Sequence, residues 1–247
     1  MRNNSGFKNI VFGIWPIVEA LREAKSFNKI LIQKGNKSEE IGEILRLCRK
    51  LEIPIQTVPV QKLNRITKKN HQGIIGFTSP IDFLSLEEVI SRIYEEGRYP
   101  FLLILDRITD VRNFGAICRT AEAAGVDAII FPEKESAMIG PDAIKTSAGA
   151  IFNLDFCREK DLLESVEHIK NSGIKIVSCT EKTDKSYKEL DFKGPIALVM
   201  GSEEDGISEE ILKISDIKSS IPMLGKTKSL NVSVACGILL YEIVASR

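Results

Sequence analysis

The chain has few of the residues from which metal centres and disulfide frameworks are built. Its 247 residues include only two histidines, His71 and His168, and five cysteines that lie far apart with no CxxC pair. This spacing argues against a structural zinc site and against a disulfide framework. We therefore expect no bound metal. Scattered single cysteines are typical of a protein that works in the reducing cytoplasm.

Long hydrophobic runs are also lacking. No apolar stretch reaches the roughly 18–20 residues that a membrane-spanning helix needs. The first residues, MRNNSGFKNIVFG, contain no hydrophobic core followed by a small-residue cleavage site, so we expect no signal peptide. Hydrophobic residues make up 43% of the sequence and the mean hydropathy is −0.02. These values are typical of a soluble globular protein without a membrane partner.

The chain has no net charge, because 34 basic residues balance 34 acidic ones, but the two signs are unevenly distributed. Residues 1–80 contain 14 Lys and Arg against 6 Asp and Glu, a balance of +8, whereas residues 81–247 have a balance of −8. This difference predicts two domains with different partners, the basic one facing a polyanion such as RNA. The basic segment KLNRITKKNHQG is the best candidate for that contact. Its candidate RNA-binding residues are Lys62, Arg65, Lys68, Lys69 and His71. His71 either contacts RNA or only closes a turn.

Hydrophobic periodicity predicts a small α/β unit over residues 1–80, followed by a linker with one helix over residues 81–99. In the first unit, SEEIGEILRLCRKLE has the spacing of an amphipathic helix that Ser38 caps. The remaining elements of this unit are expected at 15–25 (helix) and at 28–33, 54–59 and 73–80 (strands). Because of its charge, we expect this unit to bind a polyanion such as RNA.

From residue 100 to residue 247 the pattern changes to a regular alternation of buried strands and helices. FLLILD, at 101–106, is apolar almost throughout, as expected for a strand that is buried on both faces. Further strands are expected at 127–132, 150–156, 174–179, 195–201 and 217–223. This alternation predicts a parallel sheet covered by helices on both faces, and ligands bind beyond the carboxyl ends of such strands.

Three loops after these strands contain polar residues that a plain connection does not need. The first, LDRITDVRNFGAICRTAEAAG, contains Asn113, which can cap the next helix, and Arg119, whose small apolar neighbours imply an anionic partner. The second, VMGSEEDGIS, is an acidic turn that contains Glu203. It lacks the glycine spacing of a phosphate-binding loop and suits a cationic or hydroxyl-bearing ligand. The third, IPMLGKTKSLNVSVA, places Ser229 and Asn231 at the start of the last helix, where capping requires only one of them.

In this order and spacing, NFGAICRTA, LVMGSEEDG and IPMLGKTKSLNVSVA resemble the three motifs of the SpoU/TrmH branch of the SPOUT methyltransferases. The resemblance runs from about residue 100 to the C-terminus. The N-terminal part, through NHQGIIG, is similar to the substrate-binding domain of RlmB-type ribosomal RNA guanosine-2′-O-methyltransferases, which has the fold of a small kink-turn-binding ribosomal protein. The resemblance implies a C-terminal parallel sheet tied in a trefoil knot, S-adenosylmethionine as methyl donor, and a homodimer.

The resemblance also implies roles for particular residues. The positions that match the family's polar catalytic residues are Asn113, Arg119, Glu203, Ser229 and Asn231. The positions that match its cofactor pocket are Thr180, Met200, Gly201, Ile221, Met223 and Leu230. Directly before the first motif, Arg112 adds a positive charge at the entrance that faces the RNA.

The implied reaction sets clear chemical demands. A ribose 2′-hydroxyl is a very weak acid, so the site has to stabilise the developing alkoxide and align it with the methyl group. A guanidinium keeps its proton in proteins, so Arg119 is better suited to clamp a phosphate or the oxyanion than to act as a base. Glu203 would orient Arg119 or Asn113, and Ser229 would help to position the hydroxyl.

We therefore expect an enzyme that transfers a methyl group from S-adenosylmethionine to a ribose 2′-hydroxyl of RNA. The favoured target is a guanosine of large-subunit ribosomal RNA. Two alternatives stay open, namely a tRNA ribose 2′-O-methyltransferase and a non-catalytic RNA-binding factor in ribosome assembly.

Overall fold

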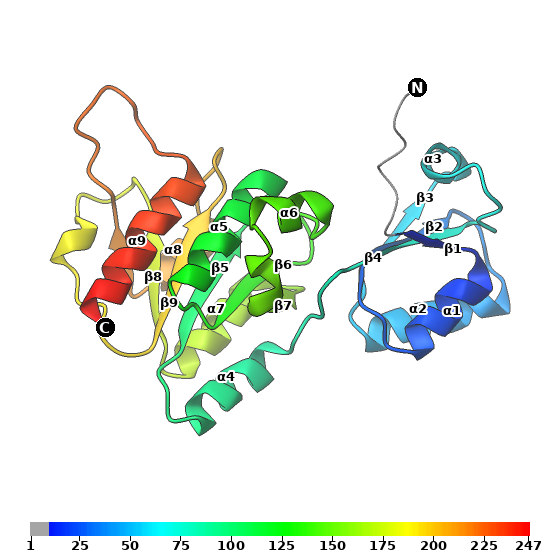
Figure 1. The fold of residues 1–247 in the computed structure, drawn as a ribbon, viewed down its shortest axis with the longest axis horizontal. Coiled ribbons are helices and arrows are strands. Elements are labelled where there is room, and N and C mark those ends of the chain that lie inside the picture. Colours follow the sequence, from blue (N-terminus) through cyan, green and yellow to red (C-terminus); the bar gives the residue numbers. More distant parts are fainter. Residues whose placement is uncertain (1–9) are drawn as a thin grey trace. The chain divides into compact units, whose positions relative to one another are not determined.

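The structure is a computed structural model of the chain that describes residues 10–247, and it divides into two compact units (Figure 1). The first unit ends at Asp82, and the second runs from Phe83 to Arg247. Each unit has its own sheet and its own buried core.

The first unit is a four-stranded sheet with helices on both faces. The strand order is β1-β4-β2-β3, in which β4 is antiparallel to both neighbours and β2 is parallel to β3. Its strands are β1 (Ile10–Phe12), β2 (Phe27–Gln33), β3 (Ile55–Val58) and β4 (Ile74–Thr78). Its helices are α1 (Ile14–Arg22), α2 (Glu39–Lys50) and α3 (Val60–Ile66). Helices α1 and α2 cover one face, and α3 covers the other through Leu63.

Two elements of this unit are not apparent from the sequence. β1 has only three residues, which is too short for periodicity to show. α3 lies within the basic segment, where the apolar residues Leu63 and Ile66 stand among charged and polar ones. Ser38 caps α2 as predicted, because its Oγ accepts a hydrogen bond from the backbone N–H of Ile41.

The second unit contains a six-stranded sheet in which every neighbouring pair is parallel. The strand order is β10-β8-β9-β5-β6-β7. The strands are β5 (Phe101–Asp106), β6 (Ala128–Pro132), β7 (Asp155–Glu159), β8 (Lys175–Cys179), β9 (Ile196–Gly201) and β10 (Ile217–Ser219). The central strands β5 and β9 are buried at every residue, since helices cover both faces. The predicted α/β fold with a parallel C-terminal sheet is confirmed.

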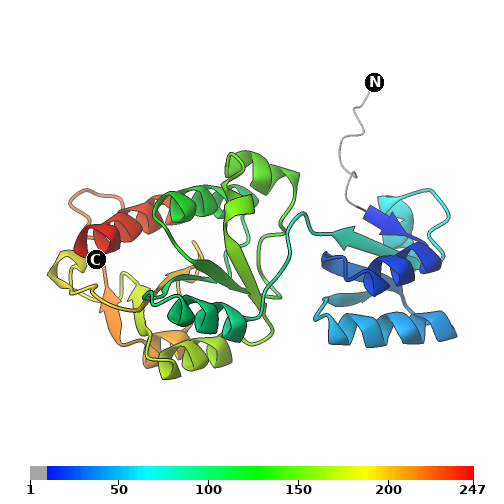
Figure 2. The same ribbon diagram turned by 60° about the horizontal axis from the view of Figure 1, so that its bottom comes forward.

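Figure 2 shows the helices on both sides of this sheet. On one side lie α5 (Val111–Ala123), α6 (Pro141–Thr146), the 3₁₀ helix η1 (Ala150–Asn153) and α9 (Val232–Ser246). On the other side lie α4 (Leu86–Glu95), α7 (Leu162–Asn171) and α8 (Glu209–Ile214). A second 3₁₀ helix, η2 (Tyr187–Glu189), follows β8. The strand expected at 150–156 begins only at Asp155, because Gly149 adopts a left-handed conformation with φ of 88° and starts η1 instead.

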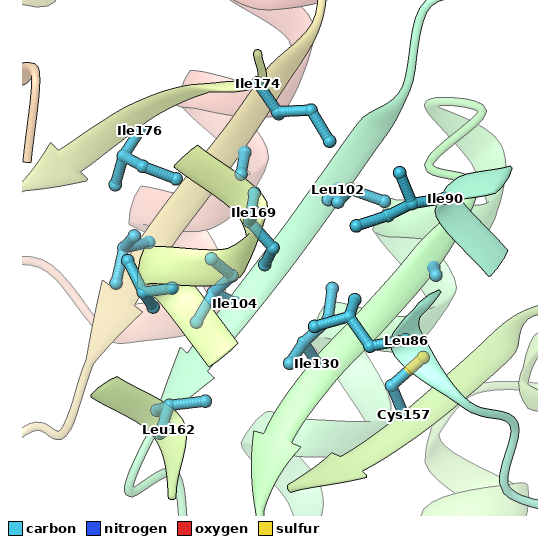
Figure 3. Close-up of a cluster of buried hydrophobic side chains, with 14 of the residues drawn as sticks. Leu86, Ile90, Leu102, Ile104, Ile130, Cys157, Leu162, Ile169, Ile174 and Ile176 are labelled. Carbon is cyan, nitrogen blue, oxygen red and sulfur yellow. The ribbon is translucent and has the colours of Figure 1, made fainter. Parts of the chain in front are cut away.

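Helix α4 belongs to the core of the second unit, although residues 81–99 read as a linker in the sequence. Figure 3 shows Leu86 of α4 near Ile130 of β6, and Ile90 of α4 beside Leu102 of β5. The same buried cluster includes side chains of α7, α8 and the strands beneath them. This face of the sheet is therefore closed only when α4 is present.

No helix among residues 10–247 is long and apolar enough to span a membrane. In the same part of the chain, no group of three or more His, Cys, Asp or Glu side chains could hold a metal ion. The five cysteines are free thiols. Burial raises the pKa of Cys48 and of Cys179 to about 12, so both thiols stay protonated and unreactive near neutral pH.

Candidate active site

Three polar side chains from distant parts of the chain meet at the carboxyl edge of the parallel sheet. The Nδ2 of Asn113 donates a hydrogen bond to Oε1 of Glu203 at 2.8 Å. The Nδ2 of Asn231 donates to the same Oε1 at 2.8 Å and to Oδ1 of Asn113 at 3.0 Å. We call these three residues the Asn–Glu–Asn triangle. They follow β5 and β9 and begin α9, so the fold of the whole unit is needed to assemble them.

Asn113 is free to join this triangle because another residue caps its helix. The Oδ1 of Asp110 accepts hydrogen bonds from the backbone N–H groups of Arg112 at 2.9 Å and Asn113 at 2.8 Å. The expectation that Asn113 itself caps the helix is therefore wrong. Helix α5 begins at Val111, so Asn113 lies inside its first turn and its side chain faces Glu203.

Asn231 uses the two ends of its amide for different purposes. Its Oδ1 caps α9 by accepting from the backbone N–H of Ser233 at 3.0 Å, while its Nδ2 donates to the Asn–Glu–Asn triangle. One residue thus provides both the cap and a site contact. Ser229 lies exposed in the preceding loop, and within residues 10–247 it makes no hydrogen bond to the triangle.

A cleft of about 540 Å³ opens beside the triangle. Asn113 and Glu203 line it, together with the carboxylates of Asp110, Glu135, Glu204 and Asp205. Among the described residues that line the cleft, Arg107 is the one basic side chain. An acidic cleft of this kind repels free anions and suits groups that donate hydrogen bonds.

Asp106 and Arg107, at the end of β5, are also part of this region, although neither was predicted from the sequence as a site residue. Asp106 is 4% exposed, and its Oδ2 accepts from the backbone N–H of Ser208 at 2.7 Å. The Nε of Arg107 donates to Oδ1 of Asp106 at 3.0 Å, and this hydrogen bond raises the pKa of Arg107 above its usual value. The sequence does contain a signal for this pair. An acidic and a basic residue stand together at the end of an apolar strand, and a carboxylate that is buried there needs a charged partner.

Arg119 does not reach the triangle within one chain. It lies six residues beyond Asn113 on α5, which is an advance of about 9 Å along a helix. Its side chain is exposed, and it has no hydrogen bond or ion pair in the described part of the chain. The expected anionic partner is therefore absent from residues 10–247, because Arg119 faces solvent rather than the small apolar side chains of its helix. Arg112 is exposed as well, in the first turn of α5.

The residues expected around a cofactor lie at the ends of three adjacent strands. Thr180 follows β8 and is 5% exposed, Met200 and Gly201 end β9, and Ile221 follows β10. The backbone N–H of Thr180 donates to the carbonyl of Ser219 at 2.9 Å, so the ends of β8 and β10 are joined. Met223 and Leu230 lie in the loop that leads to α9.

This edge of the sheet has unused hydrogen-bonding groups. In residues 10–247, no backbone N–H from Ile221 to Leu230 donates a hydrogen bond within the chain. The Oγ of Ser219 is buried and has no hydrogen-bond partner in the same residues. Buried polar groups normally have a hydrogen-bond partner, so the Ser219 hydroxyl is suited to a bound ligand, whereas the N–H groups of residues 221–230 lie in a mostly exposed loop.

The basic segment of the first unit presents most of its predicted RNA-binding side chains to solvent. Lys62 and Arg65 lie on α3, Lys68 and Lys69 in the following loop, and all four are exposed. Lys29 of β2 was not among the predicted RNA-binding residues, and its pKa is lowered by burial and by the nearby charge of Lys62. A basic surface therefore extends from α3 onto β2.

His71 does not belong to this exposed surface. It is 8% exposed, its Nδ1 accepts from the backbone N–H of Gly73 at 3.0 Å, and its Nε2 lies 2.8 Å from Oδ1 of Asn64. Because Nδ1 accepts, Nε2 carries the proton and donates to Asn64. His71 therefore closes the turn before β4, which is one of the two roles that the sequence left open for it, and its contact with RNA stays a prediction.

Family models match both units of the chain. Residues 100–241 match the SpoU rRNA methylase family, and residues 10–84 match the domain described as RNA 2′-O ribose methyltransferase substrate binding. The chain belongs to the SpoU/TrmH family of S-adenosylmethionine-dependent RNA methyltransferases. A protein of Staphylococcus epidermidis assigned to the TrmH family of tRNA/rRNA methyltransferases is 32% identical over 238 residues, 96% of each chain. A counterpart from Staphylococcus saprophyticus is 33% identical over the same share of both chains.

Solved structures of SpoU/TrmH proteins are similar to this one. The SpoU methyltransferase AviRb from Streptomyces viridochromogenes, in complex with the cofactor AdoMet, is 26% identical with a TM-score of 0.60. That match covers 96% of this chain and 90% of AviRb. The A. aeolicus TrmH/SpoU tRNA modifying enzyme is 33% identical with a TM-score of 0.55, covering 66% of this chain and 85% of the other.

Proposed function

We propose that this SpoU/TrmH protein transfers a methyl group from S-adenosylmethionine to a ribose 2′-hydroxyl of RNA. The observation that carries the proposal is the Asn–Glu–Asn triangle, assembled from three distant segments at the ligand-binding edge of a parallel sheet. A set of convergent polar groups beside a cleft is typical of an active site.

The cofactor would be held at the ends of β8, β9 and β10. The residues proposed to surround it are Thr180, Met200, Gly201, Ile221, Met223 and Leu230. The buried Oγ of Ser219 has no hydrogen-bond partner within residues 10–247, and this supports a bound polar ligand at this place. Bound S-adenosylmethionine would supply an activated methyl group on a sulfonium.

The polar side chains of the proposed site would activate and position the ribose 2′-hydroxyl. Two amides fix Oε1 of Glu203, whereas its Oε2 makes no hydrogen bond within residues 10–247. The free oxygen can accept a hydrogen bond from the 2′-hydroxyl and so increase its nucleophilicity. We assign Ser229, in the neighbouring loop, to positioning of the same hydroxyl. Arg119 would clamp a phosphate or the developing oxyanion, because its guanidinium stays charged.

We further propose a homodimer in which a second copy covers the α5–α9 face of the second unit. Val234 and Tyr241 of α9 are each 51% exposed, and Val244 is 41% exposed. Exposed apolar side chains along one helix are typical of a protein interface. Because Arg119 has no hydrogen bond or ion pair within residues 10–247, this arrangement would let it act at a site that both copies complete. We also propose the family's trefoil knot in the second unit, which the strand order and the family match support.

A guanosine of large-subunit ribosomal RNA is the proposed target. The substrate-binding match of the first unit and its exposed lysines support an RNA that is held outside the catalytic unit. A tRNA target is the second candidate, since the relatives are assigned to both RNA classes. A non-catalytic assembly factor is disfavoured by the complete Asn–Glu–Asn triangle.

We also propose a cytoplasmic location, which agrees with the free thiols of the five cysteines.

Methyl transfer from labelled S-adenosylmethionine to separated ribosomal RNA and tRNA tests this function. We expect label in large-subunit ribosomal RNA, within a dinucleotide that resists alkaline hydrolysis because its 2′-oxygen is blocked. Label in tRNA alone would replace the proposed target. Label that alkali releases as a mononucleotide would exclude ribose methylation, and no transfer to either RNA pool would favour the assembly factor.

A further inference from the structure

Arg107 has a backbone conformation that is unusual for its residue type. Its φ is 59°, in the left-handed region that side chains with a Cβ disfavour. Glycine would fit this position without strain. The position directly follows β5, at the edge of the sheet where the Asn–Glu–Asn triangle lies.

The guanidinium of Arg107 links the end of β5 to the acidic turn after β9. Its Nε donates to Oδ1 of Asp106 at 3.0 Å, and its Nη2 donates to the carbonyl oxygen of Gly206 at 3.1 Å. Its Nη1 lies 3.5 Å from Oδ2 of Asp205. The other oxygen of Asp106 accepts from the backbone N–H of Ser208, so the buried carboxylate and Arg107 together hold both sides of Gly206 and Ile207.

The acidic turn itself is a tight loop that contains Glu203. Ser202 and Gly206 exchange two backbone hydrogen bonds of 3.1 Å each. Gly201 comes so close to the end of the turn that a Cβ there would lie 2.1 Å from the carbonyl carbon of Gly206. A shift of Gly206 would therefore move the whole turn, and with it the carboxylate to which Asn113 and Asn231 donate.

We propose that Arg107 is a positioning residue for methyl transfer, which holds the 202–206 turn through Asp106 and Gly206 so that Glu203 meets Asn113 and Asn231. The inference rests on the proposed methyl transfer, and it adds a residue to that site. Arg107 makes no hydrogen bond or ion pair with a residue assigned to the cofactor, so we expect its effect to be on the reacting hydroxyl rather than on cofactor binding.

Three variants distinguish the effect of the guanidinium from the effects of the backbone conformation and of the positive charge. Arg107→Gly keeps a backbone that tolerates the left-handed conformation and removes the side chain. Arg107→Lys keeps the positive charge but cannot bridge Asp106 and the Gly206 carbonyl with a planar group. Arg98→Ala is the matched control, because Arg98 pairs with Glu96 and Asp127 at the opposite end of β5. Six residues of strand separate the two arginines by about 20 Å.

The first readout is the rate at saturating RNA and S-adenosylmethionine. We expect kcat to fall about tenfold to a hundredfold in Arg107→Gly, since small displacements of reacting groups have effects of this size. Arg107→Lys should be intermediate, and Arg98→Ala should match the wild type. The Kd for S-adenosylmethionine and the Tm should change little in all three. Ethylguanidinium at millimolar concentration should restore part of the lost kcat in Arg107→Gly.

The second readout does not depend on activity. Hydrogen exchange at the backbone N–H groups of Gly206 and Ser208 should be faster in Arg107→Gly than in the wild type and in Arg98→Ala. A wild-type protein that methylates no RNA would contradict the proposed function, whereas hydrogen exchange would still show whether Arg107 holds the turn.

Two results would overturn the inference. If Arg107→Gly has the kcat of the wild type, or the same rate of hydrogen exchange at the Gly206 N–H, then the guanidinium does not hold the turn. Arg107→Gly could instead lose Tm and cofactor affinity along with kcat, and then Arg107 would be a general structural residue. If Arg107→Gly does not fold, the kcat and exchange of Arg107→Lys decide between the same outcomes.

Discussion

Glu203 accepts hydrogen bonds from two amides on a single carboxylate oxygen, and the amides come from residues 90 positions before it and 28 positions after it. Hydrogen bonds to a charged group contribute more than neutral ones, about 1.5–3 kcal/mol each. The carboxylate is exposed enough to meet a substrate and is held in one orientation by its partners. At the scale of single residues, Glu203 is therefore the centre of the proposed site.

Glu203→Gln should reduce methyl transfer strongly while leaving the fold intact. The new amide keeps the shape of the side chain but removes the negative charge that the two asparagines contact. We expect kcat to fall about a hundredfold, a loss typical of one electrostatic group in an active site, with little change in the Kd for S-adenosylmethionine. Single-turnover rates with labelled cofactor would measure the effect. Glu210→Gln, an exposed carboxylate of α8, serves as the control. Equal rates for the two variants would remove Glu203 from the mechanism.

At the scale of elements, α4 shows how a segment between two units can belong to one of them. Its buried residues Leu86, Val89, Ile90 and Ile93 recur at the spacing of one helical face. They pack in the same cluster as strand residues of the second unit. Burial of such a side chain is worth about 1.5–3 kcal/mol, so four of them contribute roughly as much as the 5–15 kcal/mol net stability of a typical domain.

A fragment of residues 83–247 should therefore fold and bind S-adenosylmethionine, whereas a fragment of residues 100–247 should not. The shorter fragment loses α4 and exposes the strand residues beneath it. Circular dichroism during heating would report folding, and calorimetric titration would report cofactor binding. A shorter fragment with the Tm and the cofactor affinity of the longer one would show that α4 contributes little to the core.

At the scale of the whole molecule, opposite charges are divided between the two units. The first unit presents exposed lysines and arginines, and the second unit surrounds its cleft with carboxylates. Each phosphate contact releases counterions, so RNA binding through the first unit has to weaken as salt increases. We interpret the basic unit as the part that finds the RNA and the acidic unit as the part that modifies it.

Replacing Lys62, Arg65, Lys68 and Lys69 by Ala should raise the KM for RNA and leave kcat at saturating RNA nearly unchanged. The slope of log affinity against log salt should become smaller by about 0.7 for each lost contact to a single strand. RNA binding measured from low to moderate salt would test this. The matched control replaces four exposed basic residues elsewhere in the same unit: Lys25, Arg46, Arg49 and Lys50. Equal losses in both variants would mean that overall charge, and not the basic segment, determines RNA binding.

The proposed dimer predicts that Arg119 acts across two chains. Arg119→Ala alone should abolish methyl transfer, because a phosphate or oxyanion would lose its cation, while cofactor affinity stays nearly unchanged. When this variant is mixed with Asn231→Ala and the subunits exchange, some dimers contain one complete set of residues. We expect part of the activity to return in the mixture. Without such recovery in mixed dimers, Arg119 would have to act within its own chain, and a collapse of cofactor affinity would place it in the cofactor pocket.

The parallel sheet and most residues of the proposed site could be predicted from the amino-acid sequence. Short apolar runs such as FLLILD are typical of strands buried on both faces, and polar residues directly after such strands lie at the ligand-binding edge. Asn113, Glu203 and Asn231 were recognisable for this reason and through their motifs.

Which residues meet depends on the tertiary structure, because hydrogen bonds between residues 90 and 118 positions apart require that distant loops come together. The tertiary structure placed Asp110 as the cap of α5, buried His71 in a turn and left Arg119 in solvent. It also added α4 to the core and Arg107 to the site, since periodicity shows which face of an element is buried but not what packs against it.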